Sequence, residues 1–339
     1  MHKLLSTLVL IAFSQVVFAQ AFTLQIDSLL ATQKQKKFNG IILITKGEKS
    51  QYLKVQGYSN LAQKTPLNLD DQFVIGSISK QITAVLVLQD YEKGQIELNV
   101  PIRKYLPDWK QTWLDSVTVH QLLTHTHGIV AYEQPLDFVP GSKFVYSQIG
   151  YEILSKILES VTQKSFARLS SSLFKRYKML HTYHPDLHKH KHLVTGYTEL
   201  KDGTLNIEKA SFQNYVAAGS FISTANDLLL WNKALYGGKL LLPKTMELMT
   251  TRQKNATREH PMFGTTDYGY GITVDNRDGM LQYGTTGFAP GFCSMNFYYP
   301  ATKTSIIILE NITYNVNDLK KTFATQLGVW KMVRNKIND

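Results

Sequence analysis

The chain has 339 residues, of which 43% are hydrophobic, 11% aromatic and 19% charged. This composition excludes a collagen-like, low-complexity or disordered chain, and the length allows two domains or one large layered domain. The formal net charge is +11, but the lysines and arginines are scattered and accompany no recognised nucleic-acid motif. We therefore predict a solvated basic surface and no nucleic-acid partner.

The first 20 residues, MHKLLSTLVLIAFSQVVFAQ, have the three parts of a secretory signal peptide. His2 and Lys3 form the positive start, Leu4–Phe18 the apolar stretch, and Val17-Phe18-Ala19 the cleavage region. The apolar stretch is too short for a good membrane anchor, and no later segment approaches a spanning length. We predict that residues 1–19 are removed by cleavage after Ala19. The expected product is a periplasmic or secreted protein without an integral membrane segment.

The amino-terminal part of the mature chain predicts an amphipathic helix, a β-hairpin, a short strand and a long apolar helix. Apolar spacing and turn residues place these elements at residues 22–37, 39–60, 70–75 and 77–93, in that order. Gly76 separates the short strand from the second helix, and Gly94 closes that helix.

The rest of the chain is helical first and strand-rich later. Residues 95–235 show helical patterns with little strand character before Ala217, ending in a helix over Ala225–Tyr236. Strand patterns then return at residues 268–275, 279–287, 291–300 and 304–311, and Val316–Lys336 predicts a closing amphipathic helix. We infer an α+β fold, in which terminal helices flank an antiparallel sheet and a mostly helical region is inserted. One domain, 20–339, has its sheet part at about 20–76 and 236–339 and its helical part at about 77–235.

The stretch FVIGSISKQITA places Ser77 and Lys80 one turn apart where a strand gives way to a helix. The simplest alternative is an N-cap serine followed by a solvated lysine. However, a helix start supplies backbone donors for a developing negative charge, and a buried lysine loses its proton more readily. This is the S-x-x-K pattern of a serine nucleophile and its proton acceptor. The second match, Ser172-Leu173-Phe174-Lys175, follows no strand, so we predict Ser77 as the nucleophile.

The segment FVIGSISKQITAVLVLQDYEKGQIELNVPIRKYLP closely resembles the nucleophile segment of the serine β-lactamase and penicillin-binding-protein-like family, in its class C-type branch. That branch also contains D-alanyl-D-alanine carboxypeptidases and esterases. Four later segments resemble the same family in the same order: TVHQLLTHTHGI, FVYSQIGYEILSKILE, AAGSFISTANDLLLWNKAL and QYGTTGFAPGF. The resemblance runs from about residue 22 to the end and implies the β-lactamase/transpeptidase-like fold.

The resemblance also implies roles for individual residues. Tyr146 matches the tyrosine of the family's Tyr-x-Asn element and would share with Lys80 the proton taken from Ser77. Tyr58-Ser59-Asn60 fits the same pattern but precedes the nucleophile, so we predict a turn there. The backbone N–H groups of Ser77 and Phe288 would form the oxyanion hole. The substrate-binding residues implied in this way are Gln148, Thr285, Thr286, Gly287 and Phe288.

Two of these residues depart from the family pattern. Gln148 replaces an asparagine and keeps the amide on a longer arm. Thr285 stands where the family usually has the lysine or histidine of Lys-Thr-Gly or His-x-Gly, so a charge that helps hold a substrate carboxylate is missing. Unless a distant arginine or lysine compensates, we expect poorer recognition of β-lactams and of D-Ala-D-Ala termini.

A histidine-rich tract, HTYHPDLHKHKH, spans residues 181–192. Its spacing fits no closed tetrahedral site and no cysteine accompanies it, so we predict a solvated loop, no metal and no cofactor. His125 and His127, in the segment LLTHTHG, are predicted to be structural.

Together these features predict an exported serine hydrolase that forms an acyl-enzyme at Ser77. The expected substrates are small-molecule esters, amides or D-amino-acid peptides, in preference to β-lactams, because Thr285 is neutral. One alternative is a catalytically silent relative that binds peptidoglycan fragments or a protein partner. Another is a basic module that binds anionic surfaces.

Overall fold

The computed structural model describes residues 22–33, 37–187, 190–208, 215–314 and 318–338. The predicted signal peptide lies outside these ranges. Within them, every helix falls short of the length and apolarity that crossing a bilayer requires.

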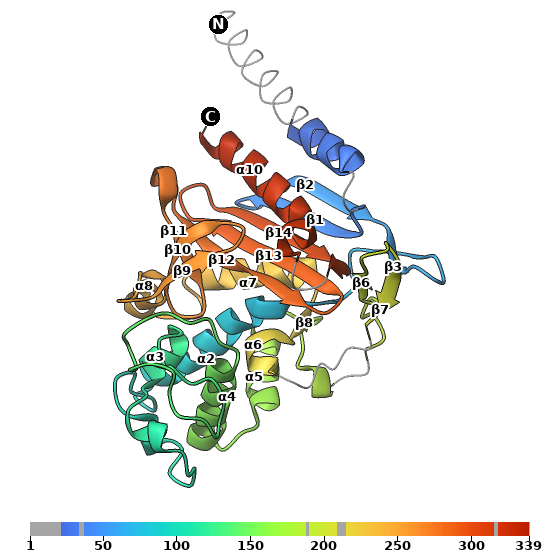
Figure 1. Cartoon of the computed structure of the whole chain (residues 1–339). Coiled ribbons are helices and arrows are strands. Elements are labelled where there is room, and N and C mark those ends of the chain that lie inside the picture. The colour runs from blue at the N-terminus through green and yellow to red at the C-terminus, as the bar shows by residue number, and fades with distance from the viewer. Residues whose placement is uncertain (1–21, 34–36, 188–189, 209–214, 315–317, 339) are drawn as a thin grey trace, which may run out of the picture.

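The centre of the molecule is an eight-stranded sheet with the strand order β2-β1-β14-β13-β12-β11-β10-β9 (Figure 1). Each strand is antiparallel to its neighbours. The strands are β1 (Gly40–Lys46), β2 (Lys49–Gln56), β9 (Thr257–His260), β10 (Gly264–Tyr268), β11 (Thr273–Asp275), β12 (Gln282–Ala289), β13 (Phe292–Tyr299) and β14 (Thr304–Glu310). The first two strands of the chain thus join a sheet whose other strands all follow the helical region, as predicted.

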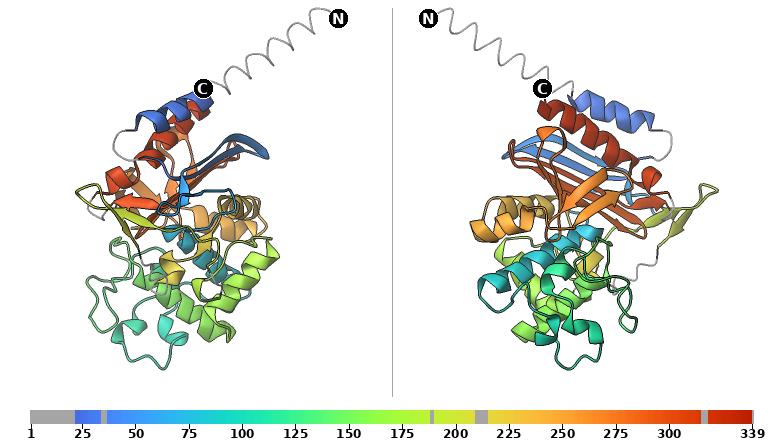
Figure 2. Two further views of the ribbon diagram at one scale, coloured as in Figure 1. Left: turned by 90° about the vertical axis from the view of Figure 1, so that its right-hand side faces the viewer. Right: turned by 60° about the vertical axis from the view of Figure 1, so that its left-hand side comes forward.

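Both faces of the sheet are buried, because β1 alternates between two hydrophobic cores. Ile42 and Ile44 lie in the core beneath a helix at residues 22–32 and the closing helix α10 (Ala324–Asn338). Ile41 and Leu43 lie in the larger core shared with the helical region. Figure 2 shows the sheet between the two terminal helices on one side and the remaining helices on the other. The predicted fold class is confirmed.

The helical region is built around α2, which is buried along nearly its whole length. On the side of the sheet opposite the terminal helices, α7 packs against β14 and β1. The helices are α2 (Ser79–Glu92), α3 (Val119–Leu123), α4 (Ile149–Thr162), α5 (Phe166–Arg176), α6 (Val216–Gly219), α7 (Ala225–Tyr236) and α8 (Pro243–Thr250).

The structure departs from the predicted elements in several places. The strand expected at residues 70–75 is only β5 (Phe73–Val74), which pairs with β8 (Ile222–Ser223). The closing helix is divided into α9 (Leu319–Thr322) and α10, because Phe323 is buried in a non-helical conformation. Within the region predicted to be helical, β6 (Tyr197–Glu199) and β7 (Leu205–Ile207) form a small sheet with β15 (Ile312–Tyr314).

The turn predicted at Tyr58-Ser59-Asn60 was wrong. These residues form the short strand β3 (Tyr58–Asn60), which pairs with β4 (Thr65–Pro66). Gly57, at a φ of +95°, ends β2, and the Asn39 side chain then accepts a 2.8 Å hydrogen bond from the Tyr58 backbone N–H. This side-chain contact holds the chain extended after the bend.

Candidate active site

Ser77 lies at the junction between β5 and α2, in the single 3₁₀ turn η1 (Gly76–Ile78). Gly76 has a φ of +54°, and a Cβ added there would lie 2.5 Å from the backbone nitrogen of Phe288. Glycine is therefore required, both for the backbone conformation and for the close approach of β12. The residues at the N-cap positions of η1 and α2 are Ile75 and Ile78, so Ser77 caps neither helix. The simplest alternative for this serine is excluded.

Lys80 projects from the first turn of α2 and is completely buried. Its Nζ lies 3.3 Å from the Ser77 Oγ, 2.8 Å from the Ala218 backbone oxygen and 2.5 Å from the Gln148 Oε1. All three acceptors are neutral. Burial lowers the pKa of Lys80, and the nearby Arg258 lowers it further, although Tyr146 opposes the shift. The environment therefore favours the neutral amine more than water does.

Tyr146 lies half-buried between two cations. The Lys80 Nζ is 4.8 Å from the centroid of its ring, and the Arg258 guanidinium carbon is 4.2 Å from it. Burial opposes ionisation of the phenol, but the positive charges of Lys80 and Arg258, with a hydrogen bond to Ser77, lower the pKa of Tyr146 below its usual value. The structure thus brings Ser77, Lys80 and Tyr146 together, with two groups whose pKa values are shifted toward proton acceptance at neutral pH.

Gln148 precedes α4, and its exposed side chain reaches back to Lys80. The amide oxygen accepts from the lysine, so the amide NH₂ points elsewhere and keeps its two donors. The longer arm of glutamine therefore serves two purposes. It anchors the amine beside Ser77 and presents hydrogen-bond donors at the surface of the site.

β12 borders Ser77 along an edge that no other strand of the described residues covers. The neighbouring β11 pairs only with Gln282–Gly284, and the second half of β12 continues past it. A Cβ added to Gly287 would lie 2.1 Å from the Ile75 backbone oxygen. This close packing sets Phe288, whose backbone nitrogen faces Gly76, beside the turn that carries Ser77. The two backbone N–H groups expected to form an oxyanion hole therefore lie on adjoining segments.

The two threonines of β12 are placed differently. The Thr285 hydroxyl donates to the Thr286 backbone oxygen, and its side chain is only 3% exposed. Thr286 pairs across the ladder with Met295, which belongs to the core under the terminal helices, and its hydroxyl lies 3.4 Å from the His260 Nε2. Because side chains alternate along a strand, Thr286 points to the sheet face opposite Gly287. Neither threonine supplies a charge.

His125 lies behind Tyr146, with 4.5 Å between the ring centroids. Its Nδ1 accepts from the Ser147 backbone N–H, so its Nε2 carries the proton and donates to the Tyr268 hydroxyl. Burial and the charge of Lys80 hold the pKa of His125 well below its usual value. The histidine is neutral and packs against the tyrosine, consistent with the predicted structural role.

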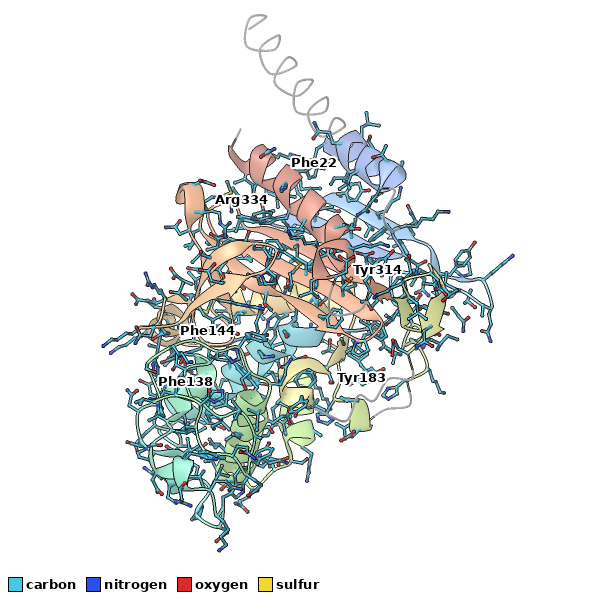
Figure 3. All side chains as sticks on the ribbon, in the orientation of Figure 1. Phe22, Phe138, Phe144, Tyr183, Tyr314 and Arg334 are labelled. Atoms are coloured by element: carbon cyan, nitrogen blue, oxygen red, sulfur yellow. The ribbon has the colours of Figure 1, made fainter. Side chains whose placement is uncertain are left out.

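The ring of Phe144 completes this aromatic cluster, 5.5 Å from His125 and 5.4 Å from Tyr268. Figure 3 shows Phe144 at the boundary between the sheet and the helical region. The candidate active site is therefore built at the contact between the two parts of the domain, and residues from both parts surround Tyr146.

Arg258 was not predicted from the sequence. It lies on β9, and no S-x-x-K, Tyr-x-Asn or Thr-Thr-Gly pattern includes it. The only signal that pointed toward it was indirect, namely the missing charge at Thr285.

The histidine tract gives no indication of a metal site in the part that the structure describes. His181 and His190 are exposed, whereas His184 is buried and its Nδ1 accepts from the Asp186 backbone N–H. His188 lies outside the described ranges. No group of three or more histidine, cysteine, aspartate or glutamate residues in the described ranges could hold a metal ion.

The chain is similar to several characterised groups of proteins. The sequence model of the family described as Beta-lactamase matches residues 26–328. Protein flp of Staphylococcus aureus strain MRSA252 is 25% identical over 319 residues, which cover 85% of this chain and 62% of flp. The chain thus spans about three fifths of the length of that relative.

Two solved structures have the same fold. The D-amino acid amidase from Ochrobactrum anthropi SV3, in complex with L-phenylalanine amide, superimposes with a TM-score of 0.81 and 20% identity, covering 94% of this chain and 98% of the amidase. A penicillin-binding protein from Bacillus halodurans superimposes with a TM-score of 0.73 and 23% identity, covering 89% of this chain and 98% of the penicillin-binding protein.

A serine and a buried lysine at a strand–helix junction, facing an open strand edge, form the arrangement expected in the β-lactamase-like class of proteins. The match over most of the chain agrees with this geometry. The chain belongs to the Beta-lactamase family, as its resemblance to serine β-lactamases and penicillin-binding proteins implied.

Proposed function

We propose that this protein hydrolyses small esters or amides of D-amino-acid or peptide type through an acyl-enzyme at Ser77. The observation that carries the proposal is the 3.3 Å approach of the Lys80 Nζ to the Ser77 Oγ. A lysine that is completely buried, with the neutral oxygens of Gln148 and Ala218 among its acceptors, is suited to take the serine proton.

In the proposed reaction, the Ser77 oxygen forms a bond to the substrate carbonyl carbon while its proton passes to Lys80 or Tyr146. The resulting oxyanion accepts hydrogen bonds from the backbone N–H groups of Ser77 and Phe288. The carbon–leaving-group bond then breaks, and the stored proton goes to the departing amine or alcohol. Water then attacks the carbonyl carbon of the acyl-enzyme in the same way, which releases the acid and restores the serine.

The substrate class is supported by two observations. The amidase that shares the fold was solved with an amino-acid amide, and Gln148 presents an amide NH₂ able to donate to a substrate carbonyl. By contrast, the neutral and buried Thr285 gives no charge for the carboxylate of a β-lactam. We therefore expect esters and amides to be better substrates than β-lactams.

The test is intact-mass spectrometry of residues 20–339 after exposure to a fluorophosphonate and, separately, to a penicillin. We expect one adduct with the fluorophosphonate, lost in Ser77→Ala and kept in the matched control Ser172→Ala, whose serine bonds the Arg168 backbone oxygen on α5. A penicillin adduct would favour a cell-wall peptidase or a β-lactamase. No adduct with either reagent would refute the hydrolase and support a binding protein.

We also propose export, on the strength of the segment at residues 1–19. Expression of the full chain in a Gram-negative host should yield a periplasmic product whose intact mass matches a chain that starts at Gln20. A cytoplasmic product that retains Met1 would contradict this part of the proposal.

A further inference from the structure

Arg258 presents a charged group to the site without a counter-ion. Its guanidinium carbon lies over the ring of Tyr146, 4.2 Å from the ring centroid, and the residue is half-buried. In the part of the chain that the structure describes, no carboxylate pairs with this guanidinium and no oxygen accepts a hydrogen bond from it. Five N–H donors of a partly desolvated cation are thus left for solvent or a ligand.

The carboxylates closest to Arg258 along the β9–β10 hairpin are engaged elsewhere. Glu259 accepts from the Thr265 hydroxyl at 2.8 Å. Asp267 pairs with Arg252, 3.2 Å from its Nε. Asp267 of the hairpin therefore neutralises Arg252, which precedes β9, and Arg258 is left charged beside Tyr146.

The charge of Arg258 reaches the whole site. It lowers the pKa of Tyr146, Lys80 and His125, all of which lie around Ser77 or behind it. The contact with the Tyr146 ring also holds the guanidinium at the site before any ligand arrives. A guanidinium fork matches the two oxygens of a carboxylate, and a half-buried cation is stabilised most by an anion that completes its hydrogen bonds.

We propose that Arg258 binds an anionic group, a carboxylate, on the substrate. It would supply from β9 the positive charge that β12 lacks at Thr285. This inference rests on the proposed function and narrows it to acyl substrates that carry a carboxylate, β-lactams included, which the neutral Thr285 alone would disfavour.

The test compares two esters with the same leaving group, mono-4-nitrophenyl glutarate and 4-nitrophenyl butanoate. Arg258→Gln should lower kcat/KM for the carboxylate ester by about 10- to 100-fold, mainly through KM, because a charge-assisted hydrogen-bond pair is lost. The neutral ester should change by less than about 3-fold. Both esters are measured on the alkaline plateau of each variant, so that a shifted pKa of the base does not enter the comparison.

Two further variants sharpen this test. Arg252→Gln removes an exposed arginine of the same segment that is already paired, and it should leave the ratio between the two esters unchanged. Arg258→Lys keeps the charge without the guanidinium fork. Its kcat/KM for the carboxylate ester should lie between those of the wild type and Arg258→Gln. Equal losses on both esters in Arg258→Gln would overturn the proposal, because Arg258 would then act on Tyr146 and not on the substrate.

Calorimetry separates this proposal from the proposed function. Intact mono-4-nitrophenyl glutarate should bind Ser77→Ala, and binding should weaken at least about 10-fold in Ser77→Ala/Arg258→Gln. A wild type that hydrolyses neither ester would contradict the hydrolase, while this titration would still decide whether Arg258 holds the carboxylate. Equal affinities in the two variants would refute the proposal.

Discussion

Gly287 is the position where a single methyl group should separate the two halves of the active site. An added Cβ would meet the Ile75 backbone oxygen at 2.1 Å and the Ser294 hydroxyl at 2.3 Å. The hydroxyl is itself fixed, since it donates to the same Ile75 oxygen at 2.8 Å. Restoring an ordinary contact of about 3.4 Å requires β12 to retreat from η1 by about 1.3 Å.

That displacement is large for a catalytic geometry. A shift of about 1 Å costs on the order of 100-fold in rate, or about 2.7 kcal/mol of activation free energy. This equals the lower estimate for losing one oxyanion donor, about 2.7–4 kcal/mol. We therefore expect Gly287→Ala to slow fluorophosphonate labelling by about 100-fold or more, because the Phe288 N–H moves away from Ser77. Overpacking should also lower the free energy of unfolding by about 1–3 kcal/mol.

The assay is the rate of mass increase per folded molecule, with the folded fraction taken from urea unfolding. Gly219→Ala is the matched control, since a Cβ there meets only Gly76, at an ordinary 3.8 Å. The control should label at nearly the wild-type rate. Wild-type labelling by a stable Gly287→Ala protein would falsify the assignment of the β12 edge to the oxyanion hole.

Three further predictions concern proton transfer and stability. Tyr146→Phe should slow acylation by about 10²–10⁴-fold in burst kinetics, and a change below 3-fold would remove the phenol from the proton path. Arg258→Gln removes a charge that lowers the pKa of both Tyr146 and Lys80. In a plot of kcat/KM against pH, the rising limb should therefore move to higher pH whichever group is the base. A rising limb at the wild-type pH would contradict this prediction. Burial lowers the pKa of His127 to about 4, so between pH 6.5 and 4 the unfolded chain binds a proton that the folded chain does not. The free energy of unfolding should then fall toward acid by up to about 1.4 kcal/mol per pH unit from this group, and in urea titrations His127→Gln should flatten that slope.

The parts of the site that follow from the sequence are those set by local order along the chain. Gly76, Ser77 and Lys80 occupy consecutive turns, so a strand, a glycine and a helical period suffice to place them. Tyr146 and Gln148 were placed by the resemblance to the family, whose Tyr-x-Asn element follows the nucleophile along the chain. The fold class followed similarly, since strand patterns at both ends with helices between them leave few arrangements of one sheet.

What the sequence could not predict depends on contacts between distant segments. Arg258 reaches Tyr146 only because β9 lies at the far end of the sheet beside the helical region, and no local period encodes that approach. Thr285 and Thr286 are adjacent and chemically alike, yet the register with β13 decides which sheet face each one occupies. Likewise, the strand at Tyr58 depends on a hydrogen bond from its backbone N–H to the side chain of Asn39.

The antiparallel pairing of β1 with β14 also sets the order of events when the chain folds. Asn39 and Asn311, at the ends of these strands, are 272 positions apart and are joined by a side-chain hydrogen bond. Ladders between such distant segments raise the contact order and form slowly. β12 is linked to β1 only through β13 and β14, so we expect the edge that faces Ser77 to be completed when these last strands dock. Reactivity toward a fluorophosphonate can thus serve as a probe of refolding, and it should appear no earlier than the docking of β13 and β14 on β1.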